Sequence, residues 1–425
     1  MKLYKYPDKK LWPEIIQRPV TDNSSLKKAV KKILQKIKEK GDKAVCKYTK
    51  EFDEVNLKNL LVSRKEITRA EVLLNNDLKL AIQQAKKNIE QFHAAQKEEV
   101  KKIETIPGVM CWRQSVGIEK IGLYIPGGSA PLFSTVLMLG IPAQLAGCKE
   151  VILCTPPSKD GSINSAILYT ANLCGITKIF KAGGVQAIAA MAYGTESIPK
   201  VFKIFGPGNQ YVTLAKQLVQ QWGVAIDMPA GPSEVLVIAD ETAIPEFVAA
   251  DLLSQAEHGP DSQFILVTPN ESIAEEVSTA INYQLEKLPR KEIVRNVLQN
   301  SKAVITGNIM EAVEFSNLYA PEHLILSCAD AEEISKQIIS AGSVFIGNYS
   351  PESAGDYASG TNHTLPTNGY AAMYSGVSLD SFVKKITYQK LTKEGLENIG
   401  NTIMTMAKAE GLDAHKNAVA IRLKK

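Results

Sequence analysis

From about residue 117 onward, short apolar runs alternate with segments of helical periodicity. IGLYI, EVILC, KIFKA and VFKIF form a first set of runs, and EVLVIAD, FILVTP, AVITG, LILS and SVFIG form a second. Helical stretches such as INSAILYTANL lie between them. Strands that alternate with helices in this way are typical of βαβ units around a parallel sheet. The sequence therefore predicts two α/β units in series, over about 120–233 and about 234–348.

The segments outside these units are predicted to be mostly helical. In TDNSSLKKAVKKILQKIKEKG a Lys-rich amphipathic run ends at Gly41, where glycine is expected after the last turn of a helix. A stripe spaced at four and three residues predicts another helix with His93 at its edge, in a structural role. The stripe consists of Leu78, Ile82, Ala85, Ile89 and Phe92. A long Gly/Ser/Asn/Pro-rich loop at 348–376 is of a kind that is often functional, and helices over about 392–409 and 412–424 end the chain.

Composition excludes several classes of protein. The 425 residues are 45% apolar and 22% charged, which is ample for packed cores in roughly two to four domains. Forty-nine basic residues are interspersed with 45 acidic ones and leave a net charge of +4, so no nucleic-acid-binding stripe is expected. The six cysteines are scattered and form no C-x-x-C pair. This argues against a disulfide framework or a zinc ribbon and suits a reducing compartment.

One uncharged stretch, 121–148, is long enough to span a bilayer. Several prolines and glycines interrupt it, which favours a buried glycine-rich loop followed by a helix. The N-terminal MKLYKYPDKKLWPE lacks the apolar core of a signal peptide. We therefore expect a cytoplasmic protein that does not contact a membrane.

Three glycine-containing turns follow predicted strands, at 124–128, 182–186 and 205–209. Each leaves backbone N–H groups free at a helix start, where a phosphate can bind. Ordinary turn geometry is the alternative, and the sequence does not decide between them. The phosphate-loop, metalloprotease, nucleophile-elbow and dinucleotide fingerprints (G-x-x-x-x-G-K-[ST], H-E-x-x-H, G-x-S-x-G and G-x-G-x-x-G) are absent.

The five histidines limit any chemistry that needs an imidazole. Gln255 and His258 stand three residues apart at the end of a predicted helix, so both can reach one cation. Asp356 and His415 are candidates to complete a tetrahedral site, although spacing does not show that such distant residues converge. A solvated surface histidine and aspartate are the alternative.

Two further pairs of residues have chemical potential. Glu322 and His323 join a carboxylate to a candidate general base at the entry of an apolar strand, where an exposed polar dipeptide is the alternative. Cys148 and Cys154 flank another strand and are candidates for a thiol that attacks an aldehyde. The sequence shows no neighbour that would lower a thiol pKa, so we expect both cysteines to serve in packing.

Taken together, a series of longer motifs resembles the histidinol dehydrogenase family, in the family's order from about residue 20 to the C-terminus. These motifs are GDKAVCKYTKEFD, GLYIPGGSAPLFSTVLMLGIPAQLAG, AGGVQAIAAMAYGT, KIFGPGNQYV, DMPAGPSEVLVIAD, DLLSQAEHG, APEHL, AGSVFIG, ESAGDYASGTNHTLPT and EGLDAHKNA. The resemblance implies NAD-dependent oxidation of L-histidinol to L-histidine through L-histidinal, the last step of histidine biosynthesis, with one zinc ion per subunit.

The resemblance also implies roles for particular residues. It gives the acid/base roles to Glu322 and His323. It makes Gln255, His258, Asp356 and His415 the zinc ligands. Its substrate contacts are the four zinc ligands and, in addition, Ser233, His323, His363 and Glu410. Its NAD contacts are Tyr124, Gln186 and Asn209.

The implied architecture is two incomplete Rossmann-like, aldehyde-dehydrogenase-like units in a homodimer whose active sites are shared between subunits. Residues 1–24 are expected to form an N-terminal arm, and 25–119 with 234–378 a first α/β domain that carries the zinc and substrate site. Residues 120–233 are expected to form a second domain that binds NAD. Residues 379–425 are expected to form a helical segment that reaches the partner subunit.

Three other functions stay open at this point. A dehydrogenase of the same scaffold that acts on another small alcohol, such as a sulfonated diol, is the nearest. A zinc hydrolase or amidase that uses the same ligands without a nucleotide is the second. A non-catalytic nucleotide-binding module is the third.

Overall fold

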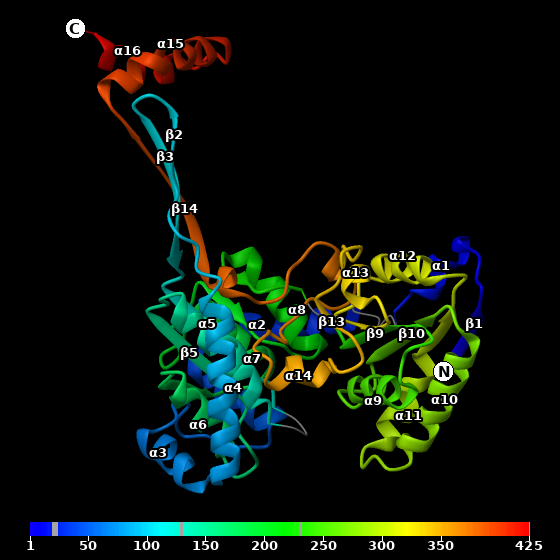
Figure 1. Cartoon of the computed structure of the whole chain (residues 1–425). Helices are drawn as coiled ribbons and strands as arrows, with labels where there is room; N and C mark the ends of the chain where they lie inside the picture. Colours follow the sequence, from blue (N-terminus) through cyan, green and yellow to red (C-terminus); the bar gives the residue numbers. More distant parts are fainter. Residues whose placement is uncertain (19–23, 128–130, 230, 425) are drawn as a thin grey trace.

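The computed structural model describes residues 1–18, 24–127, 131–229 and 231–424. They form two parallel sheets, each covered by helices, and an antiparallel arm that projects from the body (Figure 1). The last residue of the first glycine turn, Gly128, and the residues expected to cap the first long helix, 21–23, lie outside the described residues. The prediction of an α/β fold with two parallel sheets is confirmed.

The larger sheet has six strands in the order β1-β11-β10-β9-β12-β13, and every neighbouring pair is parallel. The strands are β1 (Lys2–Lys5), β9 (Glu234–Ala239), β10 (Gln263–Thr268), β11 (Lys302–Ile305), β12 (His323–Ser327) and β13 (Ser343–Ile346). In β9, Val235 and Val237 face one core and Leu236 and Ile238 the other. This alternation with period two buries both faces, as the continuous apolar run EVLVIA predicts.

Helices cover both faces of this sheet. On one face lie α9 (Pro245–Ala256), α10 (Glu271–Leu285) and α11 (Lys291–Asn300). On the other lie α1 (Trp12–Ile15), α12 (Ile309–Tyr319) and α13 (Ala331–Ser335). Both faces of the sheet are therefore buried, and only the ends of its strands are available for polar groups.

The smaller sheet has five parallel strands in the order β6-β5-β4-β7-β8. They are β4 (Lys120–Tyr124), β5 (Glu150–Thr155), β6 (Lys178–Lys181), β7 (Lys203–Phe205) and β8 (Ala225–Ile226). One face is covered by α2 (Ser24–Phe52), α7 (Gly184–Tyr193) and α8 (Gln210–Val219). The other face is covered by α3 (Arg64–Leu73), α4 (Asn76–Ala94), α5 (Phe133–Leu145) and α6 (Ser165–Leu173).

The packing of the N-terminal helices differs from the expected domain division. The division grouped 25–119 with 234–378, yet the apolar faces of α2, α3 and α4 are buried against the helices of the five-stranded sheet. The helices on that sheet are almost wholly apolar, so they need a second layer to cover them, and α2 to α4 provide it. The expected arm at 1–24 differs as well, because its first residues form β1, the edge strand beside β11.

The predicted helices in this region are otherwise present. Gly41 has φ +48° and ψ −134° and kinks α2. The first helical stretch therefore ends at this glycine as expected, and a second stretch follows it within α2. On α4, Ile82, Ala85 and Ile89 are buried as predicted, while Phe92 is exposed and His93 takes its place in the core.

The projecting arm is the feature that the sequence did not predict. Strands β2 (Lys102–Ile106), β3 (Val109–Gly117) and β14 (Val383–Leu391) form an antiparallel sheet in the order β14-β3-β2. The helices α15 (Lys393–Ala409) and α16 (Asp413–Leu423) pack on each other at its tip (Figure 1). Residues 379–425 are therefore not wholly helical, because β14 builds the stalk of the arm.

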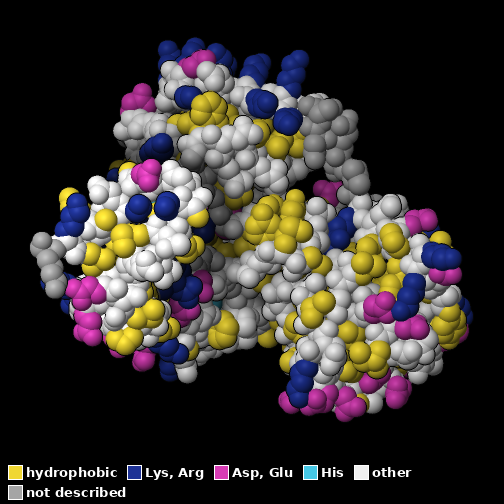
Figure 2. Space-filling view, turned by 90° about the horizontal axis from the view of Figure 1, so that it is seen from above, with side chains coloured by type: hydrophobic (Ala, Val, Ile, Leu, Met, Phe, Trp, Pro, Cys, Tyr) yellow, Lys and Arg dark blue, Asp and Glu magenta, His cyan; other side chains and the backbone are white. Residues whose placement is uncertain are grey.

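Two further expectations concern segments with unusual composition. The uncharged stretch contains α5, which is buried on all sides, and no helix among the described residues is long and apolar enough to cross a membrane. The long loop contains a short helix, α14 (Glu352–Tyr357). The expectation of interspersed charges can be followed in Figure 2, where Lys and Arg side chains are intermingled with Asp and Glu side chains over the two larger parts of the molecule.

Candidate active site

Polar residues gather at the amino ends of two neighbouring strands in the six-stranded sheet. Glu234 is the first residue of β9 and His323 is the first of β12, and the register of the two strands sets His323 opposite Val235. Glu322 directly precedes His323. The parallel pairing therefore brings the predicted acid/base pair beside Glu234.

His323 is held in one tautomer by the backbone. Its Nδ1 lies 3.1 Å from the carbonyl oxygen of Glu234, and because a carbonyl only accepts hydrogen bonds, Nδ1 carries the proton. The other ring nitrogen, Nε2, is buried and has no hydrogen-bond partner among the described residues. Burial lowers the pKa of His323 to about 3, so the ring is neutral near pH 7 and Nε2 has a free lone pair.

Glu322 is buried beside the same backbone residue. Its Oε2 accepts a hydrogen bond of 2.9 Å from the Glu234 amide and lies 3.7 Å from Nδ1 of His323. Burial raises the pKa of Glu322 well above its usual range, and the neighbouring carboxylates of Glu234, Glu352 and Asp356 raise it further. A carboxyl group in this setting holds its proton more tightly than an exposed glutamate does, which suits acid/base chemistry.

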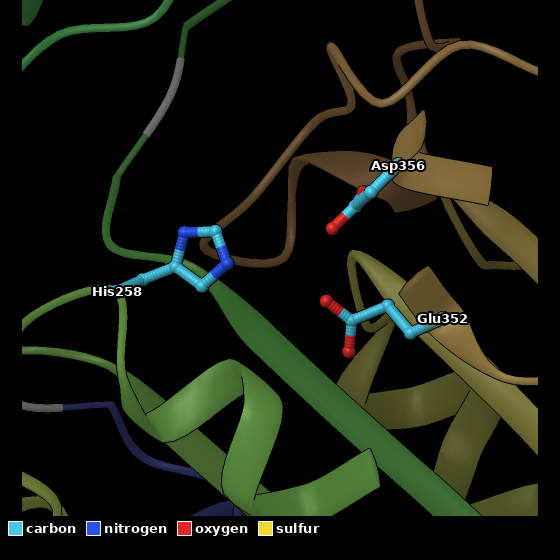
Figure 3. A group of neighbouring side chains, drawn as sticks. All are labelled: His258, Glu352 and Asp356. Atoms are coloured by element: carbon cyan, nitrogen blue, oxygen red, sulfur yellow. The ribbon is translucent and has the colours of Figure 1, made fainter. Parts of the chain in front are cut away.

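A group of potential metal ligands lies next to the acid/base pair. One ligand atom each of His258, Glu352 and Asp356 lies within 4.8 Å of the other two, and Figure 3 shows both carboxylates turned toward the imidazole. His258 follows the end of α9, and the two acids come from α14. Burial raises the pKa of Asp356 to about 6, while the nearby His258 opposes the shift.

The polar atoms around Glu352 show whether this group fits a cation. Gln255 is oriented so that its amide nitrogen donates to Oε1 of Glu352 at 2.6 Å and its oxygen accepts from the Glu234 amide at 2.8 Å. The other carboxylate oxygen of Glu352 is buried without a partner among the described residues. Carboxylate oxygens and an imidazole nitrogen are common metal ligands, so His258, Glu352 and Asp356 fit a metal ion.

His363 and Ser233 lie at the edge of the same site. Nδ1 of His363 donates to the Asp356 carbonyl at 2.9 Å, and its Nε2 lies 3.0 Å from Oγ1 of Thr135 on α5. His363 therefore connects the metal-ligand group to the helices of the other sheet. Ser233 precedes Glu234 at the start of β9 and is half-buried.

The two predicted residues of the C-terminal segment lie elsewhere. Glu410 follows α15 and His415 is in α16, and both are exposed at the tip of the arm, away from the sheets (Figure 1). Within one chain the structure brings Gln255, His258 and Asp356 together, but not His415.

A large cavity opens at the carboxyl ends of the five-stranded sheet. It has a volume of about 1030 Å³, and Tyr124, Gln186 and Asn209 line it together with the glycine turns. The Tyr124 hydroxyl accepts from the Gly184 amide at 3.1 Å, and Oε1 of Gln186 is buried without a partner among the described residues. The structure thus gathers the three predicted NAD contacts around one space of the size expected for a ligand.

A buried ion pair supports the third glycine turn. Gly206 has φ +126°, and a Cβ atom there would lie 2.0 Å from the Tyr124 carbonyl oxygen, so only glycine fits. Asp227 accepts from the Gly206 amide at 2.8 Å, and Lys216 donates to the Gly206 carbonyl at 2.7 Å. Lys216 and Asp227 also pair with each other in the core.

The cysteines occupy packing positions. Cys154 is fully buried in the core of the five-stranded sheet, and burial raises its thiol pKa. Burial also raises the pKa of Cys148, to about 11, so neither sulfur is a thiolate near pH 7.

Sequence reasoning missed Glu352 as a site residue. It precedes Asp356 by four residues, which is one helical turn, so a helix prediction for ESAGDY would have set both carboxylates on one face. Glu234 was missed for another reason. Its backbone makes the contacts with the acid/base pair, and no residue type signals such a role.

A large cavity at the strand ends of one parallel sheet, together with a buried acid/base pair on the other, is compatible with a dehydrogenase. Comparison with known proteins identifies the same class. The family model for histidinol dehydrogenase matches residues 16–423, so the chain belongs to the histidinol dehydrogenase family. Its activity is that of this family, in histidine biosynthesis.

Individual relatives match over the whole chain. A histidinol dehydrogenase from Bacteroides thetaiotaomicron is 60% identical over 423 residues, which cover 100% of this chain and 99% of that protein. One from Vibrio parahaemolyticus is 53% identical, with 97% and 95% covered. The crystal structure of histidinol dehydrogenase from Elizabethkingia anophelis has a TM-score of 0.98 at 61% identity and covers 100% of this chain and 98% of its own. An acetylating aldehyde dehydrogenase from Geobacillus thermoglucosidasius has a TM-score of 0.49 at 14% identity, with 89% and 94% covered.

Proposed function

We propose that this chain oxidises L-histidinol to L-histidine through L-histidinal, with two NAD⁺ per turnover and one zinc ion per subunit, as the last step of histidine biosynthesis. The single observation that carries the proposal is the buried Nε2 of His323, which has a free lone pair beside a group of metal ligands. A neutral base with a free lone pair in this position can take a proton from a molecule bound beside it.

His323 is the proton acceptor for the alcohol. The Glu234 carbonyl keeps the proton on Nδ1, so Nε2 is the atom that takes the hydroxyl proton. Removal of this proton makes departure of hydride from the same carbon easier. The carboxylates of Glu322, Glu352 and Asp356 lie within 4.0 Å of the ring and stabilise the imidazolium that forms.

Glu322 is the base for the second oxidation. The aldehyde must add water before it can lose a second hydride, and the water adds more readily when a base takes one of its protons. Burial and the surrounding carboxylates raise the pKa of Glu322, which makes its ionised form a stronger base than an exposed glutamate. The carboxylate therefore takes the proton from water, while His323 takes the proton of the hydrate.

Gln255, His258 and Asp356 are the zinc ligands that this chain supplies to its own site, and Glu352 adjoins them. A zinc ion held there would bind the amine and imidazole nitrogens of histidinol and so fix the alcohol carbon in place. The side-chain amide of Gln255 contacts Glu352, and this position beside the group supports its role as a ligand.

The site is completed by a second copy of the chain. His415 is the fourth zinc ligand and Glu410 a substrate contact, both contributed by the partner of a homodimer. The position of both residues on an arm that leaves the body supports this proposal. Ser233 and His363, which border the site within one chain, are the other substrate contacts.

NAD⁺ binds in the cavity of the five-stranded sheet. Tyr124, Gln186 and Asn209 contact it, and the unpartnered Oε1 of Gln186 is free to accept from a carboxamide or a hydroxyl. Helix α7 begins at the second glycine turn, and its N-terminus favours the phosphates of the dinucleotide.

Formation of NADH during incubation with histidinol tests the proposal. We expect two NADH per histidinol consumed, loss of activity after removal of the metal by a chelator, and recovery with zinc. A sulfonated diol in place of histidinol tests the nearest alternative. Turnover of the diol alone would exclude the proposed substrate, and hydrolysis of an amide without NADH would point to a zinc amidase.

A further inference from the structure

One residue, Glu234, holds both members of the acid/base pair through its backbone. Its amide nitrogen donates to Oε2 of Glu322 at 2.9 Å, and its carbonyl oxygen lies 3.1 Å from Nδ1 of His323. A small shift at the start of β9 would therefore alter the direction of the Glu322 carboxylate and the tautomer of His323 together.

The side chain of Glu234 is fixed by an arginine from the N-terminal segment. Nε and Nη2 of Arg18 donate to the two carboxylate oxygens at 2.6 and 2.8 Å, which is a two-pronged ion pair. The Asn368 amide donates to Oε1 at 2.6 Å as well. The Glu234 side chain is only 3% exposed, so this carboxylate depends on these partners for its charge compensation.

Arg18 is itself held in one place. Its Nη2 donates to the Tyr319 carbonyl at 2.7 Å, and its guanidinium lies 3.9 Å from the centre of the Tyr319 ring. Tyr319 is fully buried at the end of α12, and its hydroxyl donates to Gln263 at 2.9 Å. The arginine thus connects α12 to the first residue of β9.

A buried ion pair of this kind adds little to stability compared with apolar side chains of the same volume. Its position gives it another use, because Glu234 lies between Arg18 and the two reacting side chains. Arginine suits the task, since its planar fork fixes both the position and the direction of a carboxylate.

We propose that Arg18 and Glu234 are positioning residues for the oxidation: their ion pair fixes the backbone at the start of β9, and through it the free Nε2 of His323 and the carboxylate of Glu322. Neither residue touches the substrate. This inference rests on the proposed role of His323 as proton acceptor.

The test is a double-mutant cycle between Arg18→Met and His323→Asn, with kcat as the readout. In the otherwise natural enzyme, Arg18→Met is expected to lower kcat by about 10- to 100-fold and to leave the KM for NAD⁺ within about 2-fold. In the His323→Asn background the same change is expected to have almost no further effect on kcat, because the first oxidation, which needs the Nε2 of His323, then limits turnover and Glu322 acts only in the second. Equal losses in both backgrounds would overturn the proposal.

Lys216→Met provides the matched control. It also removes the cation of a buried ion pair, but one that supports the NAD cavity. Its effect on kcat/KM is expected to be the same in both backgrounds, as two independent sites require. If Arg18→Met fails to fold, Arg18→Lys enters the same cycle. Lysine keeps the charge without the fork, so a smaller loss of kcat that again disappears in the His323→Asn background is expected.

The two proposals fail separately. A His323→Asn enzyme with near-normal kcat would refute the role of His323 itself. A strongly impaired His323→Asn enzyme that loses kcat equally again on Arg18→Met would refute only the positioning role.

Discussion

The two parallel sheets carry their polar residues at opposite ends of their strands. In the five-stranded sheet, Tyr124, the glycine turns and Asn209 follow the carboxyl ends and surround a cavity. In the six-stranded sheet, Glu234 and His323 begin their strands, so the site lies at the amino ends. The carboxyl ends are the usual position for ligands in open α/β sheets, and only the first sheet follows that rule.

The difference shows how each end of a sheet selects a ligand. The carboxyl ends lead into helix N-termini, whose free N–H groups favour an anion such as a phosphate. The amino ends in the six-stranded sheet receive the end of α9 and the acidic helix α14. Helix C-termini and carboxylates favour a cation. The five-stranded sheet thus offers a strand end that suits an anion, and the six-stranded sheet one that suits a cation.

The largest expected effects concern the completeness of the two sites. The cavity of the five-stranded sheet is built from one chain, whereas the proposed zinc site needs His415 of a second copy. His258→Ala and His415→Ala are each expected to lose zinc and activity. Mixing the two variants under subunit exchange is expected to restore about a quarter of natural activity, because half of the dimers are hybrids with one intact site. No recovery despite verified exchange would argue for a site within one chain.

The next effect concerns the acid/base pair at the amino ends. His323→Asn keeps an Nδ2–H that can replace the hydrogen bond to the Glu234 carbonyl but has no lone pair in place of Nε2. It is expected to lower kcat by about 10² to 10⁴ while zinc content and histidinol binding stay close to natural. Steady-state kinetics with metal analysis checks this. Natural turnover would mean that the proton leaves by another route.

The ion pair under the cavity tests the other sheet. Lys216→Met leaves Asp227 charged in the core and is expected to cost about 3 kcal/mol of stability. It should raise the KM for NAD⁺ more than it lowers kcat, since the turn at Gly206 borders the cavity. Urea unfolding and kinetics measure both effects. Lys178→Met is the control, because the Lys178 side chain is 56% exposed in its pair with Glu150, and such pairs contribute about 1 kcal/mol or less.

The smallest expected effect concerns His93, on a helix of the five-stranded sheet. Buried His93 on α4 contacts Asn362, and burial lowers its pKa to about 4 from 6.5. Between pH 6.5 and about 4 the unfolded chain binds this proton and the folded chain does not, so stability falls as the pH is lowered through that window. His93→Gln does not titrate. The stability difference between natural protein and variant is therefore expected to shrink by about 2 kcal/mol from pH 7.5 to pH 5, as measured by unfolding midpoints. A constant difference would mean that His93 titrates normally.

The sequence predicts the two sheets well because their strands are buried on both faces and read as continuous apolar runs. It does not predict the arm, since all five residues of β2 are exposed and carry no apolar pattern that marks a strand. Helices α2 to α4 are themselves predictable. Their choice of sheet is not, because an amphipathic helix shows that it packs without showing against what.

The candidate site divides in a similar way. Long motifs gave Gln255, His258, Asp356, Glu322 and His323, and the fold gathers these five. Arg18 lies before all of those motifs, and its partner is 216 residues away in the chain. Such a contact follows from the parallel order of β9 and β12 and from the position of α12, which only the assembled sheet shows.

The arm has a consequence for the order of events during synthesis. Its strands β2 and β3 leave the ribosome early, but their third partner, β14, lies more than 260 residues later in the chain. Both parallel sheets have all their strands before β14 is made. The stalk, and with it the tip that carries His415, can form only when translation is almost finished. A chain released shortly before its end would therefore have both sheets but could not contribute His415 to the proposed zinc site of a second copy.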